Sequence, residues 1–324
     1  MDLLPATVAL IVGFAGLVWG ADRFISAAAG GAKTLGISPI IIGLTVVSIG
    51  TSAPEVIVSI NAAILGAGEL AVGNALGSNL ANIGLVLGIT ALIAPLPAQR
   101  HLVFQEGPVL ILITLLAGLC LYNASLDRPE SIAMLLAIPL LLWVTVKHKK
   151  QHPDAEEIAL VEEFSGMPAR TAGIWFLVGL TVMLAASNAL VWGARVVALE
   201  LGMSELMVGL TIVAVGTSLP ELAASVASAL RGHHDIAIGN VFGSNVFNLL
   251  MVMPVAGAIA PVNLDPAVFS RDYFAVGIFT LLLVGVIGIK HWLTRKGTVY
   301  LTRQFGCVLL IAYIAYYVAL LPGA

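Results

Sequence analysis

The sequence predicts an all-α integral membrane protein in which ten transmembrane helices form two inverted repeats of five. Three observations support this fold class: the composition, an internal repeat, and an odd number of apolar segments in each half. Hydrophobic residues make up 59% and charged residues 10% of the 324 residues, with a mean hydropathy of +1.03. Soluble domains carry about 25% charged residues. The sequence has no basic tail and no Gly-rich phosphate loop, so no nucleic-acid partner is expected.

The internal repeat aligns residues 43–88 with residues 209–254 without a gap, and about 20 of the 46 aligned positions are identical. The pattern Gly-Thr-Ser-x-Pro-Glu begins at Gly50 and again at Gly216. The pattern Gly-Asn-x-x-Gly-Ser-Asn-x-x-Asn begins at Gly73 and again at Gly239. Most differences exchange one apolar residue for another, so the shared constraint lies in hydroxyls, amides and carboxylates.

Apolar runs of about 20 residues predict the membrane crossings. In the first half they cover about 4–21, 38–65, 70–94, 107–123 and 130–147, and in the second about 172–193, 204–230, 236–261, 272–290 and 303–321. One long polar stretch separates the halves. The expected domains are therefore an N-terminal repeat at 1–147, a linker at 148–170 and a C-terminal repeat at 171–324.

The distribution of positive charge predicts the orientation. Five crossings place the two halves in opposite orientations. With the amino terminus outside, only Arg128, Arg195 and Arg271 of the 15 Lys and Arg residues lie outside, and the rest lie inside. Because positive residues concentrate in cytoplasmic loops, we expect a multi-pass protein of the cell membrane (inner or plasma), with both termini outside and the central loop cytoplasmic.

Two prolines predict where the helices break. Pro54 and Pro220 lie in helical apolar runs, lack an N–H, and free the carbonyls of Gly50 and Gly216 four residues earlier. Irregular backbone at membrane depth is tolerated only where protein buries it or where it lines a cavity. Helices 2 and 7 are therefore expected to be broken, with a binding site where the repeats meet.

Oxygen-bearing side chains surround these breaks. Each break is followed by a glutamate, which costs about 2.5–3.5 kcal/mol at the bilayer centre on insertion scales. The spacing of four residues places a threonine beside each glutamate, and a serine beside an asparagine, on one helix face. Calcium prefers six to eight oxygen ligands, and the motifs contain no Cys or His that would favour zinc or copper. The candidate ligands are Thr51, Ser52, Glu55, Ser78, Asn82, Thr217, Ser218, Glu221, Ser244 and Asn248.

Helix packing is the alternative explanation for some motif residues. Small residues let membrane helices approach closely, which accounts for Gly73, Gly77, Gly84, Gly239 and Gly243. Both a packing role and a binding role stay open for Asn74, Asn79, Asn240 and Asn245. A cytoplasmic turn contains His233, His234 and Asp235. That cluster is either an ordinary wetted loop or a metal or pH sensor.

The two motif copies resemble the α-repeats of the sodium/calcium exchanger family, within the calcium:cation antiporter superfamily. The resemblance implies that Glu55 and Glu221 are the central carboxylates shared by calcium and sodium. It also implies that the hydroxyls of the motif serines and threonines complete the sites, with the backbone carbonyls of Ser48 and Ala214 as sodium ligands. Potassium-dependent relatives carry aspartate where this chain has Asn248.

The function expected from these features is exchange of sodium for calcium by alternating access, with no cofactor and no obligatory protein partner. A proton/calcium antiporter using the same glutamates is the alternative. A passive cation channel is disfavoured by the inverted repeat. An enzyme is not expected, because no His lies in a motif to form a nucleophile–base pair or a metal triad.

Overall fold

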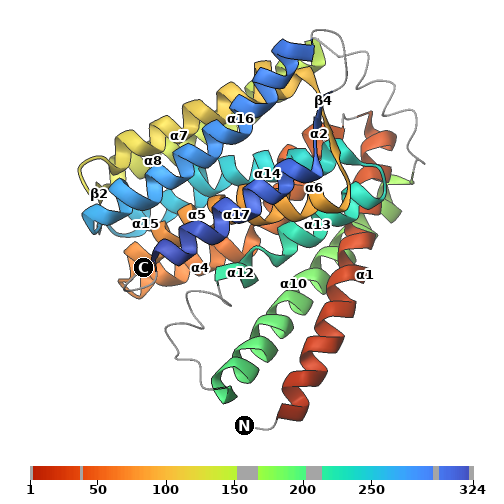
Figure 1. Ribbon diagram of the computed structural model, residues 1–324, viewed down its shortest axis with the longest axis horizontal. Coiled ribbons are helices and arrows are strands. Elements are labelled where there is room, and N and C mark those ends of the chain that lie inside the picture. The colour runs from red at the N-terminus through yellow and green to blue at the C-terminus, as the bar shows by residue number, and fades with distance from the viewer. Residues whose placement is uncertain (1–2, 37–38, 152–166, 202–213, 295–298, 321–324) are drawn as a thin grey trace. The chain divides into compact units, whose positions relative to one another are not determined.

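The computed structural model describes residues 3–36, 39–151, 167–201, 214–294 and 299–320 (Figure 1). Within these residues the chain is helical apart from two short strand pairings. Seven helices are long and apolar enough to cross a membrane, or up to eight if one bent pair counts as a single span. The all-helical class is confirmed, but this count is below the ten predicted crossings. One reason is that the predicted crossing 204–230 is described only from Ala214 onward.

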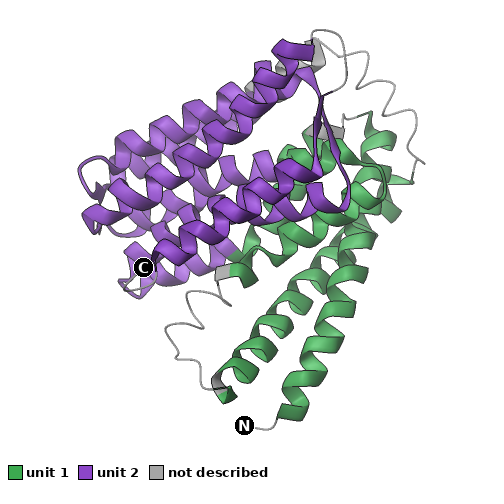
Figure 2. Cartoon of the chain, in the orientation of Figure 1, with its two compact units in different colours: residues 1–54, 149–240 green, residues 55–148, 241–324 purple. Residues whose placement is uncertain are grey.

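The described chain forms two compact units (Figure 2). Unit 1 contains residues 1–54 and 149–240, and unit 2 contains residues 55–148 and 241–324. Each unit therefore combines segments from both sequence halves. The division expected at residues 147 and 171 separates the two halves of the sequence repeat. The two compact units of the structure are divided at other residues.

Two long antiparallel helices, α1 (Leu3–Leu35) and α10 (Ala169–Glu200), dominate unit 1. Their backbones touch: a Cβ on Gly20 would lie 2.7 Å from the Met183 nitrogen, and one on Gly179 would lie 2.5 Å from the Phe24 nitrogen. Such contact needs small residues at the seam. Both helices are longer than the predicted runs 4–21 and 172–193, because helix formation continues through the polar residues at which the apolar runs stop.

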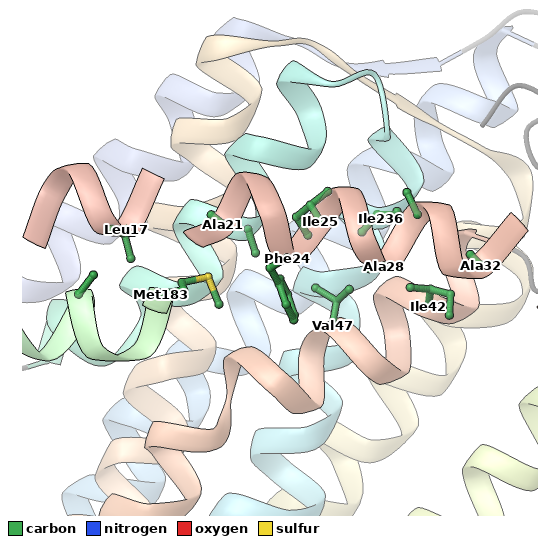
Figure 3. Close-up of a cluster of buried hydrophobic side chains, with 13 residues drawn as sticks. Leu17, Ala21, Phe24, Ile25, Ala28, Ala32, Ile42, Val47, Met183 and Ile236 are labelled. Atoms are coloured by element: carbon green, nitrogen blue, oxygen red, sulfur yellow. The ribbon is translucent and has the colours of Figure 1, made fainter. Parts of the chain in front are cut away.

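The core of unit 1 gathers around Phe24, which is fully buried (Figure 3). Its ring lies 4.6 Å from that of Phe176, between centroids. Further apolar side chains come from α2 (Pro39–Ile42), the π-helical turn η1 (Gly43–Val47) and α14 (His234–Phe247). The short helices α3 (Ser48–Thr51), α12 (Ala214–Thr217) and α13 (Leu219–Leu230) complete the unit. This core holds η1, and with it the helix that leads to the first motif.

Unit 2 contains the remaining helices. From the first half come α4 (Ala53–Ile64), α5 (Gly68–Ala81), η2 (Asn82–Val86), α6 (Leu87–Ile93), η3 (Leu102–Glu106), α7 (Gly107–Leu121) and α8 (Arg128–Gln151). From the second half come the rest of α14, then η5 (Asn248–Val252), α15 (Met253–Ile259), η6 (Val268–Tyr273), α16 (Phe274–Thr294) and α17 (Arg303–Leu320). Helix α5 packs against η5 and α15, and α17 packs against α6 and η2.

Two antiparallel pairings connect the halves within unit 2. Strand β1 (Leu96–Ala98) pairs with β4 (Val299–Leu301), and β2 (Ser125–Leu126) pairs with β3 (Val262–Asn263). Each pairing joins a segment that follows the motif of one half to a segment between later helices of the other half. Strands this short carry no alternating pattern, so the sequence does not predict them.

The structural repeat extends well beyond the aligned motif. The alignment sets Gly43 against Gly209, an offset of 166 residues, and the same offset relates the starts of helices α1 and α10, α4 and α13, and α5 and α14. It also relates the π-helical turns η2 and η5, and η3 and η6. The two halves therefore share their helix boundaries even where their sequences differ.

Candidate cation site

Both motif copies contain a helix break, as predicted. Ser52 separates α3 from α4, and the segments 43–51 and 53–64 are bent by 51°. Ser52 has φ −82° and ψ 8°, and Ser218, before α13, has φ −88° and ψ 3°. These values lie in the sparsely populated bridge region. Pro54 and Pro220 occupy the first turn of the helix after each break, where a missing N–H costs nothing.

A hydroxyl on α10 satisfies one of the two carbonyls that the prolines free. The Ser187 hydroxyl donates to the Gly216 carbonyl oxygen at 3.0 Å, in a buried setting. The residue aligned with Ser187 in the first half is Ala21, which has no hydroxyl. The sequence analysis missed Ser187, for which the signal is a lone serine in an apolar run.

The break also corrects one spacing argument. Residues four apart share a helix face only within a continuous helix, and the break at Ser52 lies between Thr51 and Glu55. The same holds for Thr217 and Glu221, which flank Ser218. Helical spacing therefore no longer supports a shared face for either threonine–glutamate pair.

In unit 1 the two motif copies meet directly. The Ser52 hydroxyl donates to Glu221 Oε1 at 3.0 Å, and both side chains are at most 1% exposed. Thr51 Oγ1 lies 3.2 Å from Asn240 Oδ1 and 3.3 Å from the Ser48 carbonyl oxygen. Residues separated by more than 160 positions thus form one buried cluster of oxygens.

The other predicted residues of unit 1 lie on α3, on α12 and at the second break. The Ser48 carbonyl accepts the Ser52 N–H at 3.0 Å, which uses one of its two lone pairs. Ala214 and Thr217 are the first and last residues of α12, and Thr217 is half-buried. Ser218 is 1% exposed.

Unit 2 holds the remaining predicted ligands: Glu55 in the first turn of α4, Ser78 on α5, Asn82, Ser244 on α14, and Asn248. All five are at most 3% exposed. Asn82 and Asn248 each begin a five-residue π-helical turn. Such turns are rare and often occur at functional sites, and no sequence pattern predicted them.

Several of these buried polar atoms have no hydrogen-bond partner within the described part of the chain. They are Ser218 Oγ, Glu221 Oε2, Ser244 Oγ, and both side-chain amide atoms of Asn82 and of Asn248. Buried polar groups are nearly always satisfied, and each exception costs about 1–3 kcal/mol. Buried oxygens without a hydrogen-bond partner are the kind of ligand that calcium requires.

Two asparagines brace the glutamate helices in the same way. Asn74 Nδ2 lies 3.3 Å from the Glu55 carbonyl oxygen and 3.5 Å from Ser59 Oγ. Asn240 Nδ2 lies 3.3 Å from the Glu221 carbonyl oxygen and 2.9 Å from Ser225 Oγ. The two serines occupy aligned positions in the repeat, a signal that could have identified them from the sequence.

The second pair of motif asparagines connects helices. In unit 2, Asn79 Nδ2 donates to the Asn245 carbonyl at 3.3 Å, and Asn245 Nδ2 donates to the Val241 carbonyl at 2.8 Å. The first bond ties α5 to α14, and the second lies within α14. The Oδ1 atoms of both residues have no hydrogen-bond partner among the described residues, so a binding role stays open beside the structural one.

The packing explanation for the glycines holds only in part. A Cβ on Gly84 would lie 2.6 Å from Tyr313 Cβ, as close packing requires. For Gly73 and Gly77, outside their chain neighbours and the adjacent backbone of their own helix, no described atom of unit 2 lies within 4 Å of an added Cβ. Packing inside unit 2 therefore does not account for these two glycines, and for them the packing explanation stays a prediction.

The turn at His233 is more buried than an ordinary wetted loop, since His233 and His234 are half-buried and Asp235 is buried. Burial, and then the nearby Arg231 and His234, lowers the pKa of His233 to about 4, so its imidazole is neutral from about pH 5 to 8. Among the residues that the structure describes, no three His, Cys, Asp or Glu side chains form a group able to hold a metal ion.

Apolar helices that are broken next to a buried carboxylate are typical of one class of membrane protein, the secondary transporters. The family model described as sodium/calcium exchanger protein matches residues 5–147 and 171–321, which is most of the chain. The chain belongs to the sodium/calcium exchanger family. The family and fold are those of a membrane transporter, not of an enzyme.

Curated relatives and a solved structure agree with this assignment. The chain is 43% identical over 318 residues to a putative antiporter, CaxA of Alkalimonas amylolytica, covering 97% of this chain and 98% of the relative. It is 41% identical over 292 residues to the inner membrane protein YrbG of Escherichia coli, covering 88% of each. A solved structure of the sodium-calcium exchanger NCX_Mj has a TM-score of 0.83 at 28% identity, covering 99% of this chain and 100% of that one.

Proposed function

We propose that this protein is a secondary antiporter that exchanges sodium for calcium by alternating access. The observation that carries the proposal is the buried hydrogen bond from Ser52 to Glu221, because it places a hydroxyl of one motif copy on the carboxylate of the other. The family supports antiport of calcium against another cation. The ions are the substrates, and the bilayer is the only other partner that the proposal needs.

The ligands in this proposal divide by charge. Glu55 and Glu221 supply the two negative charges that balance calcium. The neutral oxygens come from the side chains of Thr51, Ser52, Ser78, Asn82, Thr217, Ser218, Ser244 and Asn248 and from the backbone carbonyls of Ser48 and Ala214. The unpartnered buried atoms in this set support the assignment, because an oxygen-coordinated ion would satisfy them.

Sodium is the proposed counter-ion because most of these groups are uncharged oxygens. A proton carrier needs only the glutamates and gives hydroxyls and amides no task. Sodium is coordinated by several neutral oxygens at once, and the motif copies repeat such oxygens in pairs. The name of NCX_Mj, a sodium-calcium exchanger of closely similar fold, supports the same choice.

The decisive experiment measures radioactive calcium uptake into proteoliposomes loaded with sodium. With an outward sodium gradient, uptake should rise at least about tenfold above vesicles with equal sodium on both sides. Vesicles loaded with choline and given an outward proton gradient form the second arm. Calcium uptake driven by the proton gradient and not by the sodium gradient would show that protons, not sodium, are the counter-ion. Calcium uptake without either gradient would indicate a channel.

We further propose ten crossings in two inverted repeats with both termini outside. The constant offset of 166 residues between matching helices supports the repeat, and the charge distribution supports the orientation. In a variant with Cys120 and Cys307 replaced by alanine, Ala67→Cys should react with an impermeant thiol reagent from outside. His233→Cys, at the aligned position, should react only from inside. Labelling of both from one face would contradict the inversion.

A further inference from the structure

The direction of the Thr51 hydroxyl decides whether its oxygen can bind a cation. A hydroxyl has one hydrogen, and its lone pairs face an ion only if that hydrogen points to an acceptor elsewhere. Two acceptors lie within hydrogen-bond distance, Asn240 Oδ1 at 3.2 Å and the Ser48 carbonyl at 3.3 Å, and the Glu221 carboxylate lies near the same hydroxyl as a third, more distant acceptor. Donation to Asn240 leaves the Ser48 carbonyl available to an ion, whereas donation to Ser48 occupies it.

The Asn240 side chain is fixed in the orientation that this requires. It is fully buried, and its Nδ2 group donates to the Glu221 carbonyl at 3.3 Å and to Ser225 Oγ at 2.9 Å. The Glu221 carbonyl can only accept, so this contact assigns the nitrogen and leaves Oδ1 facing Thr51. The amide therefore connects the hydroxyl on α3 to the backbone of the glutamate on α13.

We propose that Asn240 is a positioning residue that sets the direction of the Thr51 hydroxyl. The inference rests on the proposed function, since it treats Thr51 and Glu221 as ion ligands. Both amide hydrogens of Asn240 and one of the two lone pairs of its oxygen are engaged by protein groups, which favours a positioning role over a ligand role. Asn74 makes the same two donor contacts in unit 2 but is only half-buried.

The test is a double-mutant cycle on calcium affinity, measured by titrating calcium chloride into the purified full-length protein. Asn240→Ala should weaken calcium binding about tenfold, the size expected for losing one buried hydrogen bond. Thr51→Val should weaken it by at least as much. In the Thr51→Val background, Asn240→Ala should add less than about twofold, because the residue acts through the hydroxyl.

Two further variants keep the result interpretable. Ser225→Ala removes one anchor of the amide without altering Asn240, so it should weaken binding in the same direction but less, and only when Thr51 is present. The Ser225→Ala variant replaces Asn240→Ala in the test if the Asn240→Ala protein does not fold. Thr90→Val removes a fully buried threonine hydroxyl that bonds to its own helix, and it should leave calcium affinity unchanged.

The outcomes separate this inference from the proposed function. If the wild-type protein neither binds calcium nor exchanges it, the proposed function fails before any variant is compared. If the wild type exchanges calcium but Asn240→Ala and Thr51→Val weaken binding additively, the positioning role is overturned. Unchanged affinity in a folded Asn240→Ala protein overturns it as well.

Discussion

Replacing Glu221 or Glu55 by glutamine should abolish sodium-driven calcium uptake, leaving less than about one hundredth of the wild-type rate. Removing one charge that compensates a buried ion costs about 3–5 kcal/mol, equivalent to roughly a hundredfold or more in binding. Glutamine keeps the shape of the side chain, and its oxygen can still accept the hydrogen bond from Ser52. The loss should therefore come from the missing charge, with the fold intact.

Glu69→Gln is the matched control for these variants. Glu69 is an exposed acid in the first turn of α5, where Oε1 accepts the Asp265 N–H at 3.0 Å. This variant should transport calcium at the wild-type rate. Wild-type uptake should also fall on acidification, because a proton on either site carboxylate removes a charge that calcium needs. Substantial exchange by a well-folded Glu55→Gln or Glu221→Gln protein would remove these residues from the site.

The features that follow from local chemistry could be predicted from the sequence. Proline cannot continue a helical hydrogen-bond ladder, so Pro54 and Pro220 located both breaks to within two residues. The apolar runs located most helices to within a few residues. They failed at the ends of α1 and α10, because hydropathy stops at the first polar residues while the helix continues.

Features that depend on tertiary contact could not be predicted. The sequence placed Thr51 beside Glu55 by helical spacing, and the break between them invalidates that rule. The observed partners, Asn240 for Thr51 and Glu221 for Ser52, lie in the other half of the chain. The π-helical turns at Asn82 and Asn248 also have no sequence signature, since both residues stand in otherwise regular apolar helices.

The second large effect concerns potassium, and it depends on Asn248. This side chain is 1% exposed, and both of its amide atoms lack a partner among the described residues. An amide oxygen can bind an ion but cannot balance a further charge. Potassium transported together with calcium would add a positive charge, which needs a nearby carboxylate in a buried setting. The two short patterns of each motif copy contain only Glu55 and Glu221 as acids, which the proposed calcium site already uses. The other two acids of the copies, Glu69 and Asp235, lie at the turns that begin α5 and α14.

We therefore expect sodium/calcium exchange without a potassium requirement. Replacing all potassium by choline on both sides of the vesicle membrane should change sodium-driven calcium uptake by less than about twofold. The Asn248→Asp variant adds a carboxylate at the position where the wild type has a neutral amide. Calcium uptake by this variant should become sensitive to potassium if the added charge lets a second cation bind. The wild type in choline is the arm that decides. Uptake that is largely lost there and restored by added potassium would mean that another acid of this chain balances the extra charge, and that the amide at position 248 does not exclude it.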